Sequence, residues 1–398
     1  MDIVIIADFL GELDGKGNSR FLYLADILCE SHKVEIISSD FNHGTKEYFS
    51  SVRHNEKYEI TMLHEGRYKK NVCFERFSAH FIWGCNVGKY LKKRKKPDVV
   101  YCAVPTLMAA YNAAKYCEKN KVKFIVDVQD LWPEAFQMVL NIPVLSNIIF
   151  APFKFIANEI YKRADKIVAV SETYCNRAQS VNKKCNQTYT VFLGTDLLNF
   201  DKNSKDGNIV NKKGNKLLVA YCGTLGSSYD LNCVIDALGI LKNRGTDDFQ
   251  LIVMGDGPRR EEFENYACKK KIDVVFTGKL DYADMCATLC NCDMVVNPIT
   301  KGAAQSIINK HADYVASGLP VLNTQESQEY RNLVAKYVMG FNCENGNAKD
   351  LAQKMLILRN DENLRKDMGK NARKCAEELF DRAFTYKELV EVITKKVQ

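Results

Sequence analysis

The stretch DMVVNPITKGAAQSIINKHADYVASGLPVL, residues 293–322, shows the pattern that decides the fold. It opens with an apolar run, Asp293–Ile299, and a second apolar run begins at Pro320. Between the two runs, a helix is expected from about Ser306 to Ala316. A buried strand that is followed by a helix and another buried strand predicts one unit of a parallel α/β sheet.

The same alternation extends in both directions from this stretch. Val- and Ile-rich runs separated by helical patterns lie at 2–8, 33–40, 98–104, 123–130 and 164–172. After a polar stretch at 201–215, expected to be a linker or long connection, similar runs lie at 216–226, 249–258 and 273–280. Such continuous apolar strands indicate parallel sheets covered on both faces. The sequence therefore predicts an α/β protein with two Rossmann-like, doubly wound domains facing a central cleft, and a helical tail from about residue 348.

Length and composition fit this architecture. The chain has 398 residues, 46% hydrophobic and 26% charged, which favours two globular domains. We place them at 1–195 and 196–380, followed by a C-terminal helix at 381–398 that crosses back to the first domain. The opening MDIVIIADFL is interpreted as a buried strand and not a signal peptide, and no apolar run is long enough to span a bilayer. Fifteen scattered cysteines without a Cys-x-x-Cys pair indicate free thiols in a reducing cytoplasm.

Ligands of doubly wound sheets bind beyond the carboxyl ends of the strands, so the loops there are candidates for chemistry. In the second half, two glycine-rich turns could hold a phosphate through their backbone amides. The candidate residues are Gly223, Thr224 and Gly226 in YCGTLG, and Gly255, Asp256 and Gly257 in MGDGP. Arg259 and Arg260 follow the second turn, but a charge cluster that opens a helix usually faces solvent.

The quoted stretch carries the densest set of polar side chains. Lys301 and Lys310 are cations, and the helix would place Asn309 and Asp313 on one face at i,i+4 spacing. The N-terminus of such a helix suits a diphosphate, and Lys310 could add a charge-assisted bond. Asp313 could bind a sugar or ribose hydroxyl, whereas His311 is expected to be a partly buried structural histidine.

Two loops of the first half have competing interpretations. Gly15 and Gly17, followed by Asn18, could let an anion approach the backbone, or they could form a surface turn without a ligand. In DVQDLWPE, Asp130 and Glu134 could orient sugar hydroxyls or act as a base, while Asp130 could instead cap a helix.

In order and spacing, these motifs resemble glycosyltransferase family 4, a family of retaining enzymes with the GT-B fold. The resemblance covers nearly the whole chain. In form, the chain is similar to bacterial enzymes that build O-antigen, capsule or other surface polysaccharides on a lipid carrier. The segments that carry it are DVQDLWPE, ADKIVAVSE, FLGTD, YCGTLG, MGDGP, VVFTGKLDY and NKHADYVASGLPV.

The resemblance implies a hexosyltransferase whose C-terminal domain binds a nucleoside-diphosphate sugar, expected to be a UDP-sugar. The N-terminal domain would bind a polyprenyl-diphosphate-linked or glycan acceptor. No metal and no other cofactor are expected, because protein cations and helix dipoles would stabilise the diphosphate. Retention would arise by front-face attack, with the leaving diphosphate helping to take the acceptor proton.

The chain departs from the family pattern at three places. Many members carry two glutamates eight positions apart; here these positions are Gln305 and Asp313, which we still assign to the catalytic set with Asp130. The Gly-Arg…Lys pair that usually binds the diphosphate is absent, so Lys301 or Lys310 is expected to replace it. The histidine common after the fifth strand is Gln129 here.

A basic segment in the first half requires a separate explanation. Residues 66–96 contain ten Lys or Arg and one acid, Glu75, giving a charge of +9, with Phe74, Phe77, Phe81 and Trp83 interleaved. Such a segment is typical of binding to anionic lipid headgroups, and a second apolar stretch at 144–163 could assist. A solvated helix with aromatics in the core is the alternative. Nucleic acid is a weaker fit because no recognition motif accompanies the charge.

The expected location is the cytoplasm, peripheral at the inner face of the cell membrane. Two other functions stay open at this point. One is an enzyme like a nucleotide-sugar 2-epimerase, which needs additional acid/base residues near the sugar. The other is a non-catalytic assembly subunit, which Gln305 and the missing Arg/Lys pair would suit. A dinucleotide dehydrogenase is disfavoured because Gly-x-Gly-x-x-Gly is absent.

Overall fold

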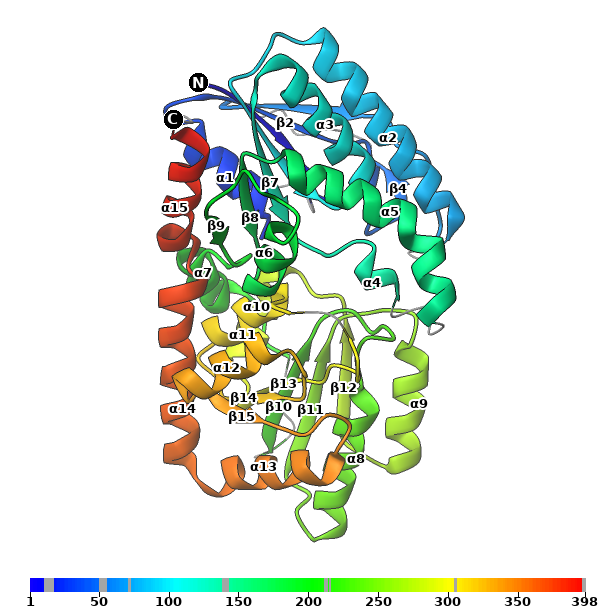
Figure 1. Ribbon diagram of the computed structural model, residues 1–398. Helices are drawn as coiled ribbons and strands as arrows, with labels where there is room; N and C mark the ends of the chain where they lie inside the picture. Colours follow the sequence, from blue (N-terminus) through cyan, green and yellow to red (C-terminus); the bar gives the residue numbers. More distant parts are fainter. Residues whose placement is uncertain are drawn as a thin grey trace. The chain divides into compact units, whose positions relative to one another are not determined.

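The computed structural model describes residues 1–10, 18–49, 56–70, 73–137, 143–210, 214, 216–303 and 306–395. The chain divides into two compact units. Unit 1 comprises Met1–Phe192 together with Thr385–Gln398, and unit 2 comprises Leu193–Phe384. Each unit contains one parallel sheet with helices on its faces, so the predicted α/β fold class with two Rossmann-like sheets is confirmed (Figure 1).

The sheet of unit 1 has seven parallel strands in the order β5-β2-β1-β6-β7-β8-β9. The central strands β1 and β6 are buried almost throughout, which explains their continuous Val and Ile content. Their register places Ile5 opposite both Ile36 and Tyr101. The strands are β1 (Asp2–Ile6), β2 (Lys33–Ser39), β5 (Glu59–Leu63), β6 (Val99–Val104), β7 (Lys123–Val128), β8 (Lys166–Ala169) and β9 (Thr188–Thr190).

The helices of unit 1 cover this sheet, and a short hairpin joins β3 (Phe41–Asn42) to β4 (Glu47–Tyr48). The core includes Tyr386 and Leu389 from the far end of the chain, which belong to α15 (Arg382–Thr394). The other helices are α1 (Arg20–Leu28), α2 (Phe74–Lys93), α3 (Leu107–Asn120), α4 (Glu134–Gln137), α5 (Pro143–Arg163) and α6 (Glu172–Gln179).

The sheet of unit 2 has six parallel strands in the order β12-β11-β10-β13-β14-β15. The strands are β10 (Leu217–Cys222), β11 (Phe249–Met254), β12 (Val274–Gly278), β13 (Met294–Asn297), β14 (Val321–Asn323) and β15 (Gly340–Asn342). The helices are α7 (Leu197–Asp206), α8 (Leu231–Asn243), α9 (Arg260–Lys270), α10 (Tyr282–Cys290), α11 (Asn309–Ala316), α12 (Gln328–Tyr337), α13 (Ala348–Asn360) and α14 (Glu362–Cys375), with a π-helical turn η1 (Ala376–Phe380) before α15.

Two expectations about local structure are wrong. The helix expected from Ser306 begins at Asn309, because Ile308 is extended and its amide donates to the Nδ1 atom of His311. The polar stretch at 201–215 is not simply a linker, since its first part belongs to α7. Asp196 caps α7 by accepting from the Asn199 amide, and Phe200 is buried, so the helix forms despite its polar sequence.

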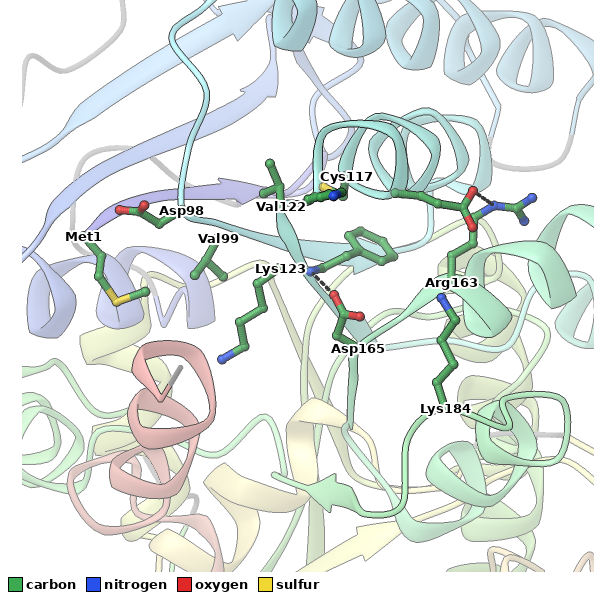
Figure 2. A pocket seen from close by; sticks show the side chains of 12 residues that line it. Met1, Asp98, Val99, Cys117, Val122, Lys123, Arg163, Asp165 and Lys184 are labelled. Carbon is green, nitrogen blue, oxygen red and sulfur yellow. Dashed lines mark hydrogen bonds and ion pairs between the residues drawn. The ribbon is translucent and has the colours of Figure 1, made fainter. Parts of the chain in front are cut away.

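The strand orders define where ligands are expected. In unit 1 the order reverses between β1 and β6, and in unit 2 between β10 and β13, so each sheet has its switch point beside its first strand. Figure 2 shows a pocket at the amino ends of the unit 1 strands, beside the starts of β6 and β7. There the Phe124 amide donates to Asp165, and Arg163 pairs with Glu118. This pocket therefore lies away from the edge where doubly wound sheets bind ligands.

Candidate functional site

The loops after β10 and β11 pack backbone against backbone. The Gly223 amide donates to the carbonyl of Met254 at 2.9 Å, and the Leu225 amide donates to the carbonyl of Asp256 at 2.9 Å. A Cβ atom on Gly255 would lie 2.0 Å from the Gly223 oxygen, and one on Gly257 would lie 2.5 Å from the Leu225 oxygen. Close packing of the two loops therefore explains Gly255 and Gly257 without a ligand.

Gly223 has a different neighbour. Its φ is +139°, a conformation that favours glycine, and a Cβ atom there would lie 2.7 Å from the Nζ atom of Lys310. The sequence separates these two residues widely, but β10 and β13 are adjacent, so the loop after β10 and the helix that follows β13 meet at one edge. The structure thus brings together Gly223 and Lys310, two of the residues expected to bind the donor.

Lys310 is a buried cation whose Nζ atom has no hydrogen-bond partner among the described residues. Its ammonium lies 3.8 Å from the ring centre of Tyr229 and 4.2 Å from that of Tyr221. The faces of these rings attract the cation. Burial nevertheless disfavours the charge and lowers the pKa of Lys310 to about 7. An anion placed beside Lys310 would restore the charged form.

Asp313 lies one turn further along α11. Its Oδ1 atom accepts a hydrogen bond from the Tyr282 hydroxyl at 3.0 Å, and that hydroxyl is also 3.0 Å from the Thr195 hydroxyl. Burial raises the pKa of Asp313 to about 6, although the Tyr282 hydrogen bond and the Arg382 guanidinium oppose the rise. Asp313 is therefore held in one position and is ionised above about pH 6, as a partner for a sugar or ribose hydroxyl requires.

A buried polar network supports α11 from the strand ends. The Asn297 amide donates to Asn323 at 3.0 Å and to Gln325 at 3.1 Å, and Gln325 donates to the Ser306 carbonyl at 2.7 Å. His311 lies between this network and the Tyr330 ring, on which it stacks at 3.5 Å. Burial lowers the pKa of His311 well below its usual value, so the ring is neutral and serves to position α11.

The positions of the remaining candidate donor residues do not by themselves indicate a role in binding. Lys301 is exposed in the turn after β13, and Asn309 is the first residue of α11. Gln305 lies outside the described residues, so its assignment to the catalytic set stays a prediction. In the turn after β10, Thr224 accepts a hydrogen bond from Tyr221 through its carbonyl, and a Cβ atom added to Gly226 would meet only the Thr224 methyl, at 3.8 Å.

The charged residues after β11 are occupied by local interactions. Asp256 accepts from the Gly257 amide at 2.7 Å and pairs with Arg260 at 3.2 Å. Arg260 also pairs with Glu264, and Arg259 pairs with Glu262. These contacts favour the solvent-facing interpretation of the two arginines over phosphate binding.

In unit 1, the two acids of the Trp-Pro turn already have partners. Asp130 accepts from the Leu131 amide at 2.9 Å and from the Trp132 indole at 3.3 Å, and burial raises its pKa. Glu134 forms an ion pair with Arg177 at 2.6 Å. Asn18 directly precedes Ser19, the cap residue of α1, whereas Gly15 and Gly17 lie outside the described residues.

The basic segment has an inward and an outward part. On the inward side, Arg94 pairs with Asp2 and Glu35, and Trp83 is in the core. For these residues the alternative of a helix with aromatics in the core fits. Phe74 is 91% exposed and Phe81 is 54% exposed on the outer face of α2. The exposed cations of the segment are Arg67, Lys69, Lys70, Lys89, Lys92, Lys93, Lys95 and Lys96.

The sequence did not point to several residues that shape the unit 2 site. Tyr221 and Tyr229 flank Lys310, and Tyr314 accepts a hydrogen bond from the Cys222 amide at 2.9 Å. Only their positions around the glycine turn could have identified these tyrosines as site residues. That signal is weak, because aromatic residues at such positions are usually part of the core. Among the described residues, the three that could share a metal ion are Asp8, Glu65 and His80, in unit 1.

Comparison with known proteins relates the segment that carries this site to a family. Residues 202–375 match the family model "Glycosyl transferases group 1". The chain is 24% identical over 247 residues to the uncharacterized glycosyltransferase MJ1069 of Methanocaldococcus jannaschii, covering 61% of this chain and 62% of that protein. It is 25% identical over 236 residues to the capsular polysaccharide biosynthesis glycosyltransferase CapM of Staphylococcus aureus, covering 57% and 60% respectively. The chain thus spans about three fifths of the length of these curated relatives.

The fold is also that of known members. The crystal structure of Anabaena Alr3699/HepE in complex with UDP matches with a TM-score of 0.68 and 17% sequence identity, covering 100% of both chains. That likeness establishes the GT-B fold, with its two Rossmann-like units. Over residues 202–375, which include the α11 site, the chain resembles the group 1 glycosyl transferases, also called glycosyltransferase family 4.

Proposed function

We propose that the protein is a retaining hexosyltransferase that moves a sugar from a nucleoside diphosphate, in the first instance UDP, to a lipid-linked or glycan acceptor in surface polysaccharide synthesis. The observation that carries this proposal is Lys310, a buried cation at the switch point of unit 2 whose ammonium has no hydrogen-bond partner among residues 216–303, 306–395 and the other described ranges. A diphosphate supplies the missing anion. The UDP complex of HepE and the capsule assignment of CapM support the donor and the pathway.

Lys310 would act on the leaving group. The glycosidic bond to the diphosphate breaks as negative charge grows on the diphosphate oxygens, and a fixed ammonium stabilises that charge in the transition state. The N-terminal turn of α11 adds a favourable dipole at the same place. These protein charges are our reason for expecting transfer without a metal.

Asp313 would fix the donor by accepting a hydrogen bond from a sugar or ribose hydroxyl. Its own bond from Tyr282 sets the orientation of the carboxylate, which is needed because misplaced substrates lose rate steeply. In this proposal the retained configuration follows from front-face attack, with a donor phosphate oxygen receiving the acceptor proton. Gln305, Lys301 and Asn309 are proposed as further donor contacts.

Unit 1 is proposed to bind the acceptor, through Gly15, Gly17, Asn18, Asp130 and Glu134. The ion pair with Arg177 fixes the position of the Glu134 carboxylate, whose oxygens can accept hydrogen bonds from sugar hydroxyls. Asp130 has a raised pKa caused by burial, so it can exchange a proton nearer neutral pH than an exposed aspartate.

The decisive experiment compares Lys310→Ala with Lys301→Ala in a UDP-sugar turnover assay. The first variant should raise the donor KM by about 10–100-fold, the range for losing a bond to a charged group. Lys301→Ala should raise it by a smaller factor, because Lys301 is a proposed donor contact whose charge is exposed and screened by solvent. Unchanged kinetics for Lys310→Ala would refute the proposed role. Release of UDP without acceptor separates an enzyme from an assembly subunit that lacks catalysis.

We also propose that unit 1 associates with an anionic membrane surface. The ring centroids of Phe77 in α2 and Phe153 in α5 are 5.3 Å apart, so the two helices contact each other at this point. The exposed apolar residues of α5 include Ile148 and Phe155, at 68% and 62% exposure. Among the described residues, no helix has the length and hydropathy needed to cross a bilayer. The apolar face and its flanking lysines therefore suit contact with the headgroup region.

Co-sedimentation with liposomes tests this surface. The full chain should sediment with vesicles that contain phosphatidylserine and much less with neutral phosphatidylcholine vesicles. A Phe74→Ser/Phe81→Ser double variant should weaken the binding, because both rings are exposed and their loss leaves the core intact. Equal binding to both vesicle types would contradict the proposal.

A further inference from the structure

A second group of buried polar residues lies at the switch point of unit 1. Asp8 follows β1 by two residues, Glu65 follows β5 by two residues, and His80 is on α2. Their exposures are 5%, 1% and 5% respectively. Parallel strands end at the same edge of the sheet, so two loops and one helix converge there.

The carboxylates of this group lack hydrogen-bond donors. Among the described residues, neither oxygen of Asp8 has a hydrogen-bond partner, nor does the Oε1 atom of Glu65. Only Glu65 Oε2 is engaged, by the Ser39 hydroxyl at 2.5 Å. Burying carboxylate oxygens without partners is costly, so the fold is expected to supply something that balances them.

The distances fit one small ion shared by three side chains. His80 Nε2 lies 3.6 Å from Glu65 Oε1 and 3.9 Å from Asp8 Oδ2, and one ligand atom from each residue lies within 4.8 Å of the others. Bonds of about 2.0–2.2 Å place opposite ligands of one ion about 4 Å apart. We propose that Asp8, Glu65 and His80 bind a divalent transition-metal ion, a site separate from the donor site of unit 2.

The surroundings favour an ion over a larger ligand. All three side chains are at least nine-tenths buried, and aromatic rings line the group, with Trp132 stacked on His80 at 5.5 Å. A saccharide needs a wider opening than such side chains leave. Two carboxylate oxygens and one imidazole nitrogen suit Mn²⁺ or Zn²⁺ better than Mg²⁺ or Ca²⁺, which prefer oxygen alone. The Ser39 hydroxyl would orient the Glu65 ligand from behind.

Arg76 is the neighbouring cation that such an ion must accommodate. Its Nε atom donates to His80 Nε2 at 3.4 Å, a long bond that metal binding would exchange. The guanidinium also lies 5.0 Å from the Trp132 ring centre and 5.9 Å from that of Tyr68, so the rings can retain it. Lys46 lies 4.8 Å from the Tyr68 ring. Asp8 and Glu65 are the two acids that can supply negative charge to a divalent ion beside these cations.

The test uses the full chain after treatment with a chelator, with Mn²⁺ as the probe. Mn²⁺ is preferred because the fifteen free cysteines would also bind Zn²⁺. Electron paramagnetic resonance of free Mn²⁺ should show one ion bound per chain. At a hundredfold excess over Kd, the unfolding temperature should rise by roughly 5–10 °C.

Variants locate the ion. Asp8→Asn and His80→Gln should abolish both the bound Mn²⁺ and the thermal shift. His64→Gln is the matched control, since the exposed His64 also contacts an aspartate, Asp40, at 3.0 Å but is not in the three-ligand group. Metal-free Asp8→Asn should unfold at least as high as the wild type, because it replaces a buried carboxyl group whose oxygens have no hydrogen-bond partner among the described residues. Glu65→Gln provides a second variant.

Two outcomes would overturn the proposal: no Mn²⁺ bound by the wild type, or equal binding by the wild type, Asp8→Asn and His80→Gln. UDP affinity measured on the same samples should be the same for His80→Gln and the wild type, because the donor residues belong to unit 2. Failure of the metal site would therefore be distinguishable from failure of the proposed transferase function.

Discussion

The two sheets have the same strand order around their first strands, yet the buried charges beyond those strands have opposite sign. Unit 2 holds Lys310 against two tyrosine rings, and its Nζ atom has no hydrogen-bond partner in the part of the chain that the structure describes. Within the same described residues, Asp8 and Glu65 of unit 1 have oxygens that no donor contacts. The same strand order can therefore support two kinds of site, because the residues in the loops, and not those in the strands, determine the charge of each site. Each site is expected to be completed by a ligand of the opposite charge.

The largest effect on the unit 2 side should come from Gly223→Ala. The new methyl group would collide with the Lys310 ammonium, and φ of +139° would strain any residue with a Cβ atom. We expect UDP affinity to fall at least tenfold and the free energy of unfolding to fall by about 1–3 kcal/mol. Calorimetric titration and urea unfolding measure the two quantities.

Gly226→Ala is the matched control for that variant. It lies in the same turn, but its Cβ atom would meet only the Thr224 methyl at 3.8 Å. Its effects should be small. If both variants weaken UDP binding equally, the turn as a whole matters and the specific contact with Lys310 does not.

An intermediate effect is expected in the pH dependence of the unit 2 site. Since the pKa of Lys310 is lowered to about 7, UDP affinity should fall as the pH rises above 7, by at most about tenfold per unit. Stability should change in the other direction: above pH 7 the unfolded chain binds the proton that folded Lys310 has lost, so stability rises with pH toward the normal lysine pKa.

Lys310→Met should remove both trends in paired measurements of UDP binding and urea unfolding across pH 6–9. A wild-type affinity that stays constant through this range would show that Lys310 keeps its charge without an anion. In that case the two units would differ only in the sign of their buried groups, and the Lys310 ammonium would not need a bound anion to stay charged.

The smallest effect is expected from Tyr282→Phe. The Tyr282 hydroxyl stabilises the Asp313 carboxylate, so its loss should raise the pKa of Asp313 above its present value of about 6. The acid side of the kcat/KM profile should move upward by about 0.5–1 pH unit. Tyr229→Phe, which leaves Asp313 untouched, should not move that limb.

Much of the fold was predictable because its signals are local. Each buried strand is a short apolar run, and the helices between them follow from spacing alone. The start of α11 was not predictable, because it depends on the His311 ring accepting the Ile308 amide. The helix α7 was missed because its polar sequence contains only two buried residues, Leu197 and Phe200.

The candidate site was predictable only in part. Lys310 and Asp313 were identified from residue type and family resemblance, but the burial of Lys310 follows from Tyr221 and Tyr229, which come from other segments. Asp8, Glu65 and His80 were not recognised as a group. They are separated in sequence by up to 72 positions, and only the strand order of unit 1 brings them together.

The core of unit 1 contains residues that the ribosome adds only after those of unit 2. Tyr386, Leu389 and Ile393 pack with side chains of β1 and α1, and the Tyr386 hydroxyl accepts a hydrogen bond from the buried Arg20. All of Leu193–Phe384 must be translated before these residues exist. At typical rates of synthesis, this takes roughly 10–40 s. Unit 1 is synthesised first but cannot complete its core until unit 2 has been synthesised. A chain truncated near residue 384 would contain all of unit 2 but would lack the part of the unit 1 core that α15 supplies.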